Sequence, residues 1–318
     1  MTHEYKKQKQ LEGNSHLNKA DKYLEVSWLK FKTSPDYDSA VIEYESAATC
    51  FTNAEMKEDA VKAHEKAAEL HIKLNTPYHA ATHIQKAAFL LREDTGRCCA
   101  LIEKASQLFS TCGNISTAAS ILAKGAKILE QTNDDSSKAT AVTMLEKAFN
   151  LEITTSRTTE AIEHLDRASK VLLTLKRFAE ARKFVERALE LYESQHNNNM
   201  IYRTGIHLIV VSLYMDDIRA AEEAHLRVGH VDSEMNAETG ALIAAYKNGD
   251  QSTVSRIVTS QTFVYTENEF ARLANNLKVP SHRLKSSDEL IEQEWNARAS
   301  GQMVPGEIGG VVDDDDWK

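Results

Sequence analysis

The side chains of this sequence that could support metal or catalytic chemistry are a few histidines, cysteines and paired acids. His79 and His83 stand four residues apart, which is the spacing at which two imidazoles on one helix can share a metal ion. The glutamate of the zinc-protease motif is missing beside them, and the sequence shows no evident third ligand. We therefore expect surface or partly buried histidines here, and neither a bound metal nor a cofactor.

The four cysteines do not form a reactive or metal-binding pattern. Cys98 and Cys99 are adjacent, while Cys50 and Cys112 stand alone, so no CxxC motif is present. No histidine partner can be argued for any of them, which speaks against a thiol nucleophile. The spacing predicts reduced thiols in an intracellular protein.

Sequence motifs of common enzyme classes are also missing. There is no phosphate-binding loop, no dinucleotide fingerprint and no nucleophile elbow. The acidic pairs at 216–217 and 222–223 resemble helix caps and solvated helix faces. These observations predict a protein that is not an enzyme.

Charge and hydropathy restrict the partners further. Among 318 residues, 47 are acidic and 38 are basic, so the formal net charge is −9. This balance argues against general nucleic-acid binding. No apolar segment has the length of a membrane span or the form of a signal peptide, so we expect a cytoplasmic protein.

A repeat of about 20 residues organises most of the chain. Segments that start at Ala40, Ala60 and Ala80 share an alanine first, a larger residue four later, an Ala-Ala pair three after that, and a bulky last residue. These positions fall on one helix face, where small side chains let a neighbouring helix approach closely. The pattern returns at about 98, 118, 141, 161 and 181, which predicts eight helices in four antiparallel pairs.

The repeat loosens after residue 199, where shorter helical segments follow. The predicted fold is all-α: an α-solenoid of antiparallel, tetratricopeptide-like helix pairs, followed by a C-terminal helical bundle. We expect three parts, namely the solenoid over residues 1–198, the bundle over 199–298, and a disordered acidic tail over 299–318.

Apolar residues alternate with lysines in an unusual position before the first repeat. Trp28, Leu29 and Phe31 are interleaved with Lys30 and Lys32, directly ahead of a proline turn. A tryptophan suits the lipid interface and lysines suit anionic headgroups, so this segment is a candidate membrane contact. The alternative is that it forms the packed end of the first helix.

Basic residues concentrate on the later repeat helices. We single out Lys124, Arg157, Arg167 and Lys170 as a basic strip that could face an acidic partner. The alternative is a set of solvated helix faces in which these cations pair with neighbouring glutamates.

The last residues combine acids with a bulky aromatic. Asp313, Asp314, Asp315 and Asp316 precede Trp317, and an aromatic in this position is unlikely to belong to a core. A tail that only increases solubility is the alternative, but it does not account for the tryptophan.

The sequence between residues 16 and 71 resembles the soluble NSF attachment proteins (SNAPs), and within them the gamma form most closely. The hexapeptide PDYDSA at 35–40 matches directly, and LIEKASQLF (101–109), AAS (118–120) and AIEHLDRASKVLLTLKRFAEA (161–181) extend the similarity. The resemblance covers roughly residues 14–280.

The resemblance implies an adaptor without an active site. SNAPs bind the four-helix bundle of assembled SNARE complexes and recruit the ATPase NSF, which disassembles the bundle after membrane fusion. It implies that the basic strip contacts the SNARE bundle, that residues 28–32 contact the membrane peripherally, and that residues 313–317 contact NSF. The ending Asp-Trp-Lys departs from the Asp-Leu-Arg typical of the alpha and beta forms, which puts the strength of NSF stimulation in question. A general helical-repeat scaffold for other protein partners is the alternative function.

Overall fold

The computed structural model describes residues 3–26, 34–229 and 233–284, and all regular secondary structure in these ranges is α-helical. The chain divides into two compact units, Met1–Lys176 and Arg177–Lys318, which are described separately. The predicted all-α fold is confirmed. No helix in the described residues is both long and apolar enough to cross a membrane.

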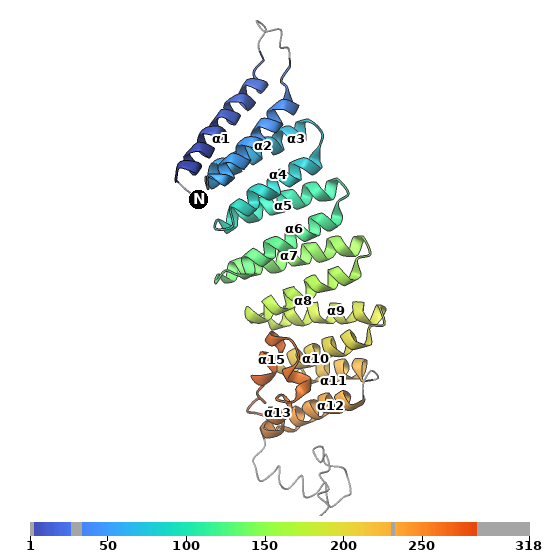
Figure 1. The fold of residues 1–318 in the computed structure, drawn as a ribbon. Coiled ribbons are helices and arrows are strands. Elements are labelled where there is room, and N and C mark those ends of the chain that lie inside the picture. Colours follow the sequence, from blue (N-terminus) through green and yellow to red (C-terminus); the bar gives the residue numbers. More distant parts are fainter. Residues whose placement is uncertain (1–2, 27–33, 230–232, 285–318) are drawn as a thin grey trace, which may run out of the picture. The chain divides into compact units, whose positions relative to one another are not determined.

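In the described residues of the first unit, eight successive helices each pack against the next one in the chain (Figure 1). They are α1 (His3–Leu24), α2 (Tyr37–Asn53), α3 (Lys57–Lys73), α4 (Pro77–Leu90), α5 (Thr95–Thr111), α6 (Ile115–Glu130), α7 (Asp135–Thr154) and α8 (Thr158–Thr174). Short connections make neighbouring helices antiparallel, as in an α-solenoid.

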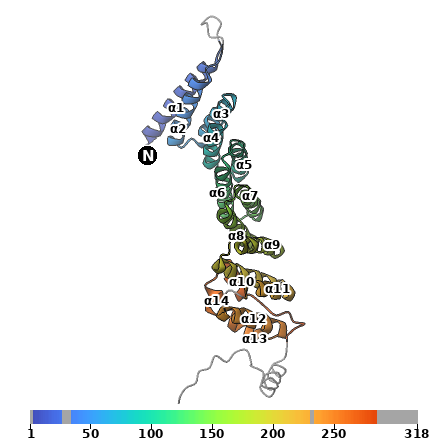
Figure 2. The same cartoon turned by 90° about the vertical axis from the view of Figure 1, so that its right-hand side faces the viewer.

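These helices form two layers, with α3, α5 and α7 on one side and α4, α6 and α8 on the other (Figure 2). Polar side chains connect next-but-one helices within a layer. Arg97 of α5 contacts Glu58 of α3 at 2.9 Å, and Arg167 of α8 contacts Glu130 of α6 at 2.8 Å. The solenoid is therefore held by apolar contacts between layers and by ion pairs along each layer.

The alanine repeat forms the contact surface between successive helices, as the sequence predicts. The first repeat positions are buried, and they are Ala40, Ala60, Ala80, Cys98, Ala118, Ala141 and Ala161 in the first unit and Ala181 in the second. The close approach is visible at Gly125 of α6, where an added Cβ would lie 2.8 Å from the Cδ1 atom of Ile102. Small residues at these positions are thus required by the spacing of the helices.

One turn motif recurs between the helices. After α3, Asn75 has a φ of 56°, and the amide of Thr76 donates a hydrogen bond to the carbonyl of His71. The same left-handed residue and six-to-one hydrogen bond occur at Gly113, where φ is 77°. This Schellman geometry satisfies the last carbonyls of a helix and starts the next helix immediately.

The second unit is a bundle around one central helix. It contains α9 (Phe178–Ser194), α10 (Asn198–Tyr214), α11 (Ile218–Val228), α12 (Ser233–Asn248), α13 (Gln251–Ile257), α14 (Gln261–Val264) and α15 (Asn268–Asn275). Helix α10 is buried over almost its whole second half and contacts α9, α11, α12 and α15. Gly205 of α10 lets Val228 of α11 approach the α10 backbone directly.

The predicted division of the chain at residue 198 stays a prediction about domains. The boundary between the two compact units lies earlier in the chain, between Lys176 and Arg177, so α9 belongs to the second unit. The predicted acidic tail over 299–318 lies outside the described residues.

Candidate functional site

Three residues of the predicted basic strip lie on α6 and α8, two helices of one layer in the first unit, and the fourth directly precedes α8. Lys124 is exposed on α6, and Arg167 and Lys170 are half-buried on α8. Arg157 is exposed and precedes the first residue of α8. The Arg167 guanidinium lies 3.4 Å from the carbonyl oxygen of Ala123, the neighbour of Lys124. The structure therefore brings Lys124 and Arg167 close together.

Arg157 makes several polar contacts within the protein that the sequence does not predict. Its guanidinium donates to Ser116 Oγ at 2.7 Å and to Glu160 at 2.6 Å, and its Nε lies 3.3 Å from a carboxylate oxygen of Glu152. Glu152 is buried, and burial raises the pKa of its carboxyl group. The Arg157 charge thus compensates a buried acid in addition to any role toward a partner.

Acidic neighbours reduce the net charge of the strip. Arg167 pairs with Glu130 and Arg157 with Glu160, as the alternative of paired helix faces expects. Lys124 makes no hydrogen bond or ion pair with another described residue. Lys124 is therefore the member of the strip whose substitution disturbs the fold least.

The predicted membrane segment, Trp28 to Lys32, lies outside the described residues, as do Asp313 to Trp317. The structure describes the residues on both sides of the predicted membrane segment. The amide of Asp36 donates a hydrogen bond to the carbonyl of Tyr23 at 2.9 Å, and the Asp36 side chain caps the first turn of α2. The end of α1 and the start of α2, which flank this segment, are therefore held close together.

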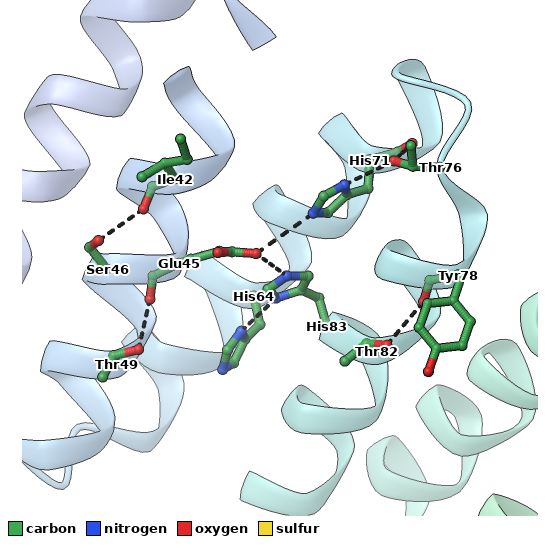
Figure 3. A network of polar contacts seen from close by, with 10 residues as sticks. All are labelled: Ile42, Glu45, Ser46, Thr49, His64, His71, Thr76, Tyr78, Thr82 and His83. Carbon is green, nitrogen blue, oxygen red and sulfur yellow. Dashed lines mark hydrogen bonds and ion pairs between the residues drawn. The ribbon is translucent and has the colours of Figure 1, made fainter. Parts of the chain in front are cut away.

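A polar cluster that the sequence does not reveal lies between α2, α3 and α4 (Figure 3). Glu45 of α2 reaches His83 of α4 at 2.7 Å and His71 of α3 at 3.7 Å, both from the same carboxylate oxygen. Behind His83, its Nδ1 atom lies 3.1 Å from Nδ1 of His64. Burial lowers the pKa of His71 and His83, and it lowers the pKa of His64 to about 4. The ligand atoms of Glu45, His71 and His83 lie within 4.8 Å of one another, so these three side chains could hold a metal ion.

Sequence spacing points to a different pair. His79 and His83 share a helix, but the exposed His79 ring stacks on His71, with 5.2 Å between ring centroids, and is not one of the three converging groups. A usable signal lies in the repeat itself. His64 and His71 occupy positions where the other repeats carry Tyr44 or Ile84 and Phe51 or Leu91, which face inward.

Two surface hollows lie among the described residues of the second unit. One, of about 360 Å³, is lined by arginines and acids of α9 and α11, but its arginines are already paired, for example Arg182 with Asp217 at 2.6 Å. The other, of about 420 Å³, lies beside Tyr202 and Tyr265. Neither hollow presents converging catalytic groups.

The four cysteines are free thiols, as predicted. Burial raises the pKa of the Cys98 thiol to about 11 and also raises the pKa of Cys99. Thiols with raised pKa values are poor nucleophiles at neutral pH.

Comparison with known proteins supports the resemblance seen in the sequence. Residues 11–152, from α1 to near the end of α7, match the family model for the soluble NSF attachment protein, SNAP. The gamma-soluble NSF attachment protein of Dictyostelium discoideum is 25% identical over 297 residues, covering 89% of this chain and 88% of that protein. The protein of the same name from Arabidopsis thaliana is 24% identical over 287 residues, covering 87% of this chain and 97% of that protein.

A solved circular tandem repeat protein with a novel repeat topology covers 83% of this chain and 70% of its own, at 14% identity and a TM-score of 0.34. A score this low carries no argument, so the fold assignment rests on the helix packing described above. The predicted resemblance to the SNAP family, closest to its gamma form, is confirmed by the family model and the two gamma relatives.

Proposed function

We propose that this chain is a SNAP-type adaptor in vesicle trafficking, which binds assembled SNARE complexes and recruits the ATPase NSF to disassemble them. The observation that carries the proposal is the family match over residues 11–152, together with gamma relatives that align over almost the whole chain. The adaptor role requires no active site of its own, and the chemistry of disassembly belongs to NSF.

The solenoid supplies a surface that suits a rigid helical partner. Lys124, Arg157, Arg167 and Lys170 concentrate cations on α6 and at the start and middle of α8. An acidic four-helix bundle would be steered to this strip by electrostatics. Because Arg157 and Arg167 already have acidic neighbours, Lys124 would contribute more of the attraction than either arginine.

Two further contacts complete the proposal. Trp28, Leu29 and Phe31, flanked by Lys30 and Lys32, would hold the adaptor weakly and reversibly on a membrane surface. Burying one large apolar side chain is worth roughly 1.5–3 kcal/mol, so three give attachment without insertion. The protein would accordingly be cytoplasmic and peripherally associated with membranes, with no role in nucleic-acid binding.

Asp313, Asp314, Asp315 and Asp316 would steer the tail toward a basic surface of NSF, and Trp317 would anchor it there. Exposed carboxylates contribute little net energy each, whereas a buried aromatic commonly dominates a small interface. Several adaptors on one SNARE bundle would raise the effective concentration of each tail near NSF.

Binding of a preassembled SNARE complex tests the proposal directly. Lys124→Glu should weaken binding, and affinity should fall as salt is raised, because exposed charges are screened over about 8 Å at physiological ionic strength. Lys62→Glu on α3 is the matched control, since it makes the same charge change at an exposed lysine in the other layer.

If affinity responds neither to salt nor to Lys124→Glu, the basic strip is not the SNARE contact. If the full chain does not bind the SNARE complex at all, the general repeat scaffold becomes the better description.

A further inference from the structure

The cluster between α2, α3 and α4 contains a buried nitrogen atom, His71 Nε2, that has no hydrogen-bond partner in the described protein. Thr76 Oγ1 donates a hydrogen bond to the His71 carbonyl at 3.0 Å, so its own proton is used. The same oxygen lies 2.9 Å from His71 Nδ1 and must accept a hydrogen bond from it. Nδ1 therefore carries the ring proton, and Nε2 of the neutral ring carries a lone pair.

This lone pair faces an acid. His71 Nε2 is buried, has no hydrogen-bond partner, and points toward Glu45 Oε1 at 3.7 Å (Figure 3). Two acceptors that face each other are unfavourable when one of them is buried, as His71 Nε2 is, unless a proton or a cation lies between them.

His83 can present a second lone pair to the same point. Its Nε2 lies 2.7 Å from Glu45 Oε1, and its Nδ1 lies 3.1 Å from Nδ1 of His64. When the His83 proton sits on Nδ1, it is donated to neutral His64, and Nε2 becomes free to bind a cation. An imidazole whose second nitrogen is fixed by an outer partner is the usual arrangement of a metal-bound histidine.

We propose that Glu45, His71 and His83 bind one Zn²⁺ ion, with a water molecule in the fourth position. Two imidazole nitrogens and one carboxylate oxygen form a ligand set that Zn²⁺ accepts. Bond lengths of about 2.0–2.2 Å place tetrahedral ligand atoms about 3.3 Å apart. The present distances of 2.7 Å and 3.7 Å lie on either side of that value.

A small movement of Glu45 would equalise these two distances. Its side chain is 45% exposed, so it can swing and the ion can enter from solvent, whereas the His83 side chain is only 3% exposed. The ligands come from three consecutive helices, so the ion would cross-link α2, α3 and α4 close to the start of the solenoid. The inference is independent of the SNARE and NSF contacts.

Zinc binding to the full chain, freed of metal by chelator dialysis, tests the proposal. We expect about one Zn²⁺ per chain in competition with a chromophoric chelator, and a rise in melting temperature on loading. Co²⁺ should give the intense d–d absorption of a four-coordinate site without a thiolate charge-transfer band, which separates this site from the free cysteines.

The repeat supplies variants that should keep the fold. His71→Leu places at position 71 the residue type that Leu91 shows at the equivalent repeat position, and Glu45→Gln changes a side chain that is partly exposed. Each should weaken Zn²⁺ binding by more than the roughly 10–100-fold that loss of an outer-shell partner costs. His64→Ile, which matches Ile84 of the next repeat, should fall within that 10–100-fold range.

His79→Gln is the matched control, because it removes an exposed histidine of α4, the helix that carries His83. His79 is not among the three proposed ligands. Its affinity and its Zn²⁺-induced rise in melting temperature should equal those of the wild type. Equal affinity in the wild type, His71→Leu and Glu45→Gln would overturn the proposal. So would a thiolate band in the Co²⁺ spectrum, or the lack of stoichiometric binding to the wild type.

Discussion

The stability of the first unit should depend on pH through one buried histidine. This histidine belongs neither to the proposed partner contacts nor to the proposed zinc site. His164 lies on α8, is 8% exposed, and its Nδ1 atom is buried without a hydrogen-bond partner. Burial, with a smaller contribution from nearby Arg167, lowers the pKa of this imidazole to about 4, and Glu160 partly opposes the shift. The folded protein therefore holds His164 neutral under conditions in which the unfolded chain protonates it.

The sign and size follow from linkage. The unfolded imidazole has a pKa near 6.5, so above that pH the group costs no stability, and stability falls as the pH drops from about 6.5 toward 4. Between pH 7 and pH 5 the unfolded chain gains most of one proton that the folded chain does not bind. At 1.36 kcal/mol per pH unit, the free energy of unfolding should fall by at most about 2 kcal/mol through this group.

Replacing His164 by methionine should remove this contribution. Methionine is the residue at the equivalent position of the preceding repeat, where Met144 is fully buried. The apparent free energy of unfolding, from urea titrations followed by circular dichroism, should fall less between pH 7 and pH 5 in His164→Met than in the wild type. His3→Gln, at an exposed histidine, should behave as the wild type. Equal pH dependence in His164→Met and the wild type would refute the reasoning.

Two further predictions concern packing and a buried charge. Gly205→Ala should lower the free energy of unfolding by about 1–2 kcal/mol, because overpacking against Val228 outweighs the gain in helix propensity. Gly96→Ala should be neutral or slightly stabilising, because an added Cβ there would meet only Asp94 Oδ1, at an ordinary contact distance of 3.7 Å. Equal effects at both sites would contradict the packing argument. Arg157→Met should lower the melting temperature clearly in the wild type and less in a Glu152→Gln background, because the arginine compensates a buried carboxylate; the same loss in both backgrounds would show that Glu152 needs no such compensation.

The solenoid could be predicted because one physical requirement repeats. Each helix must bury a face against the next one, and small residues such as Ala40 and Ala60 mark that face at a constant spacing. For the second unit, the sequence predicted only that the alanine repeat ends and that shorter helices follow. Helix α10 is apolar on several sides because it is surrounded by helices, so its sequence lacks a single periodic stripe.

The candidate sites were less predictable, because their partners come from distant helices. Arg157 looks like a free surface cation until the fold places the buried Glu152 and Ser116 beside it. The histidine cluster joins Glu45 with His83, 38 positions away, and no local spacing encodes that contact. Sequence spacing instead pairs His83 with His79, a pair for which the sequence predicts no metal, and His79 lies outside the converging group.

ATP-dependent disassembly of a preassembled SNARE complex by NSF tests the central claim most directly. The full chain should stimulate disassembly at saturating concentration, Trp317→Leu should retain that activity, and Trp317→Ala should lose most of it while still binding the SNARE complex. Full activity of Trp317→Ala, or of a chain that stops at Val312, would remove the tail from the NSF contact. A full chain that binds neither SNARE complex nor NSF and leaves disassembly unchanged would contradict the adaptor function itself.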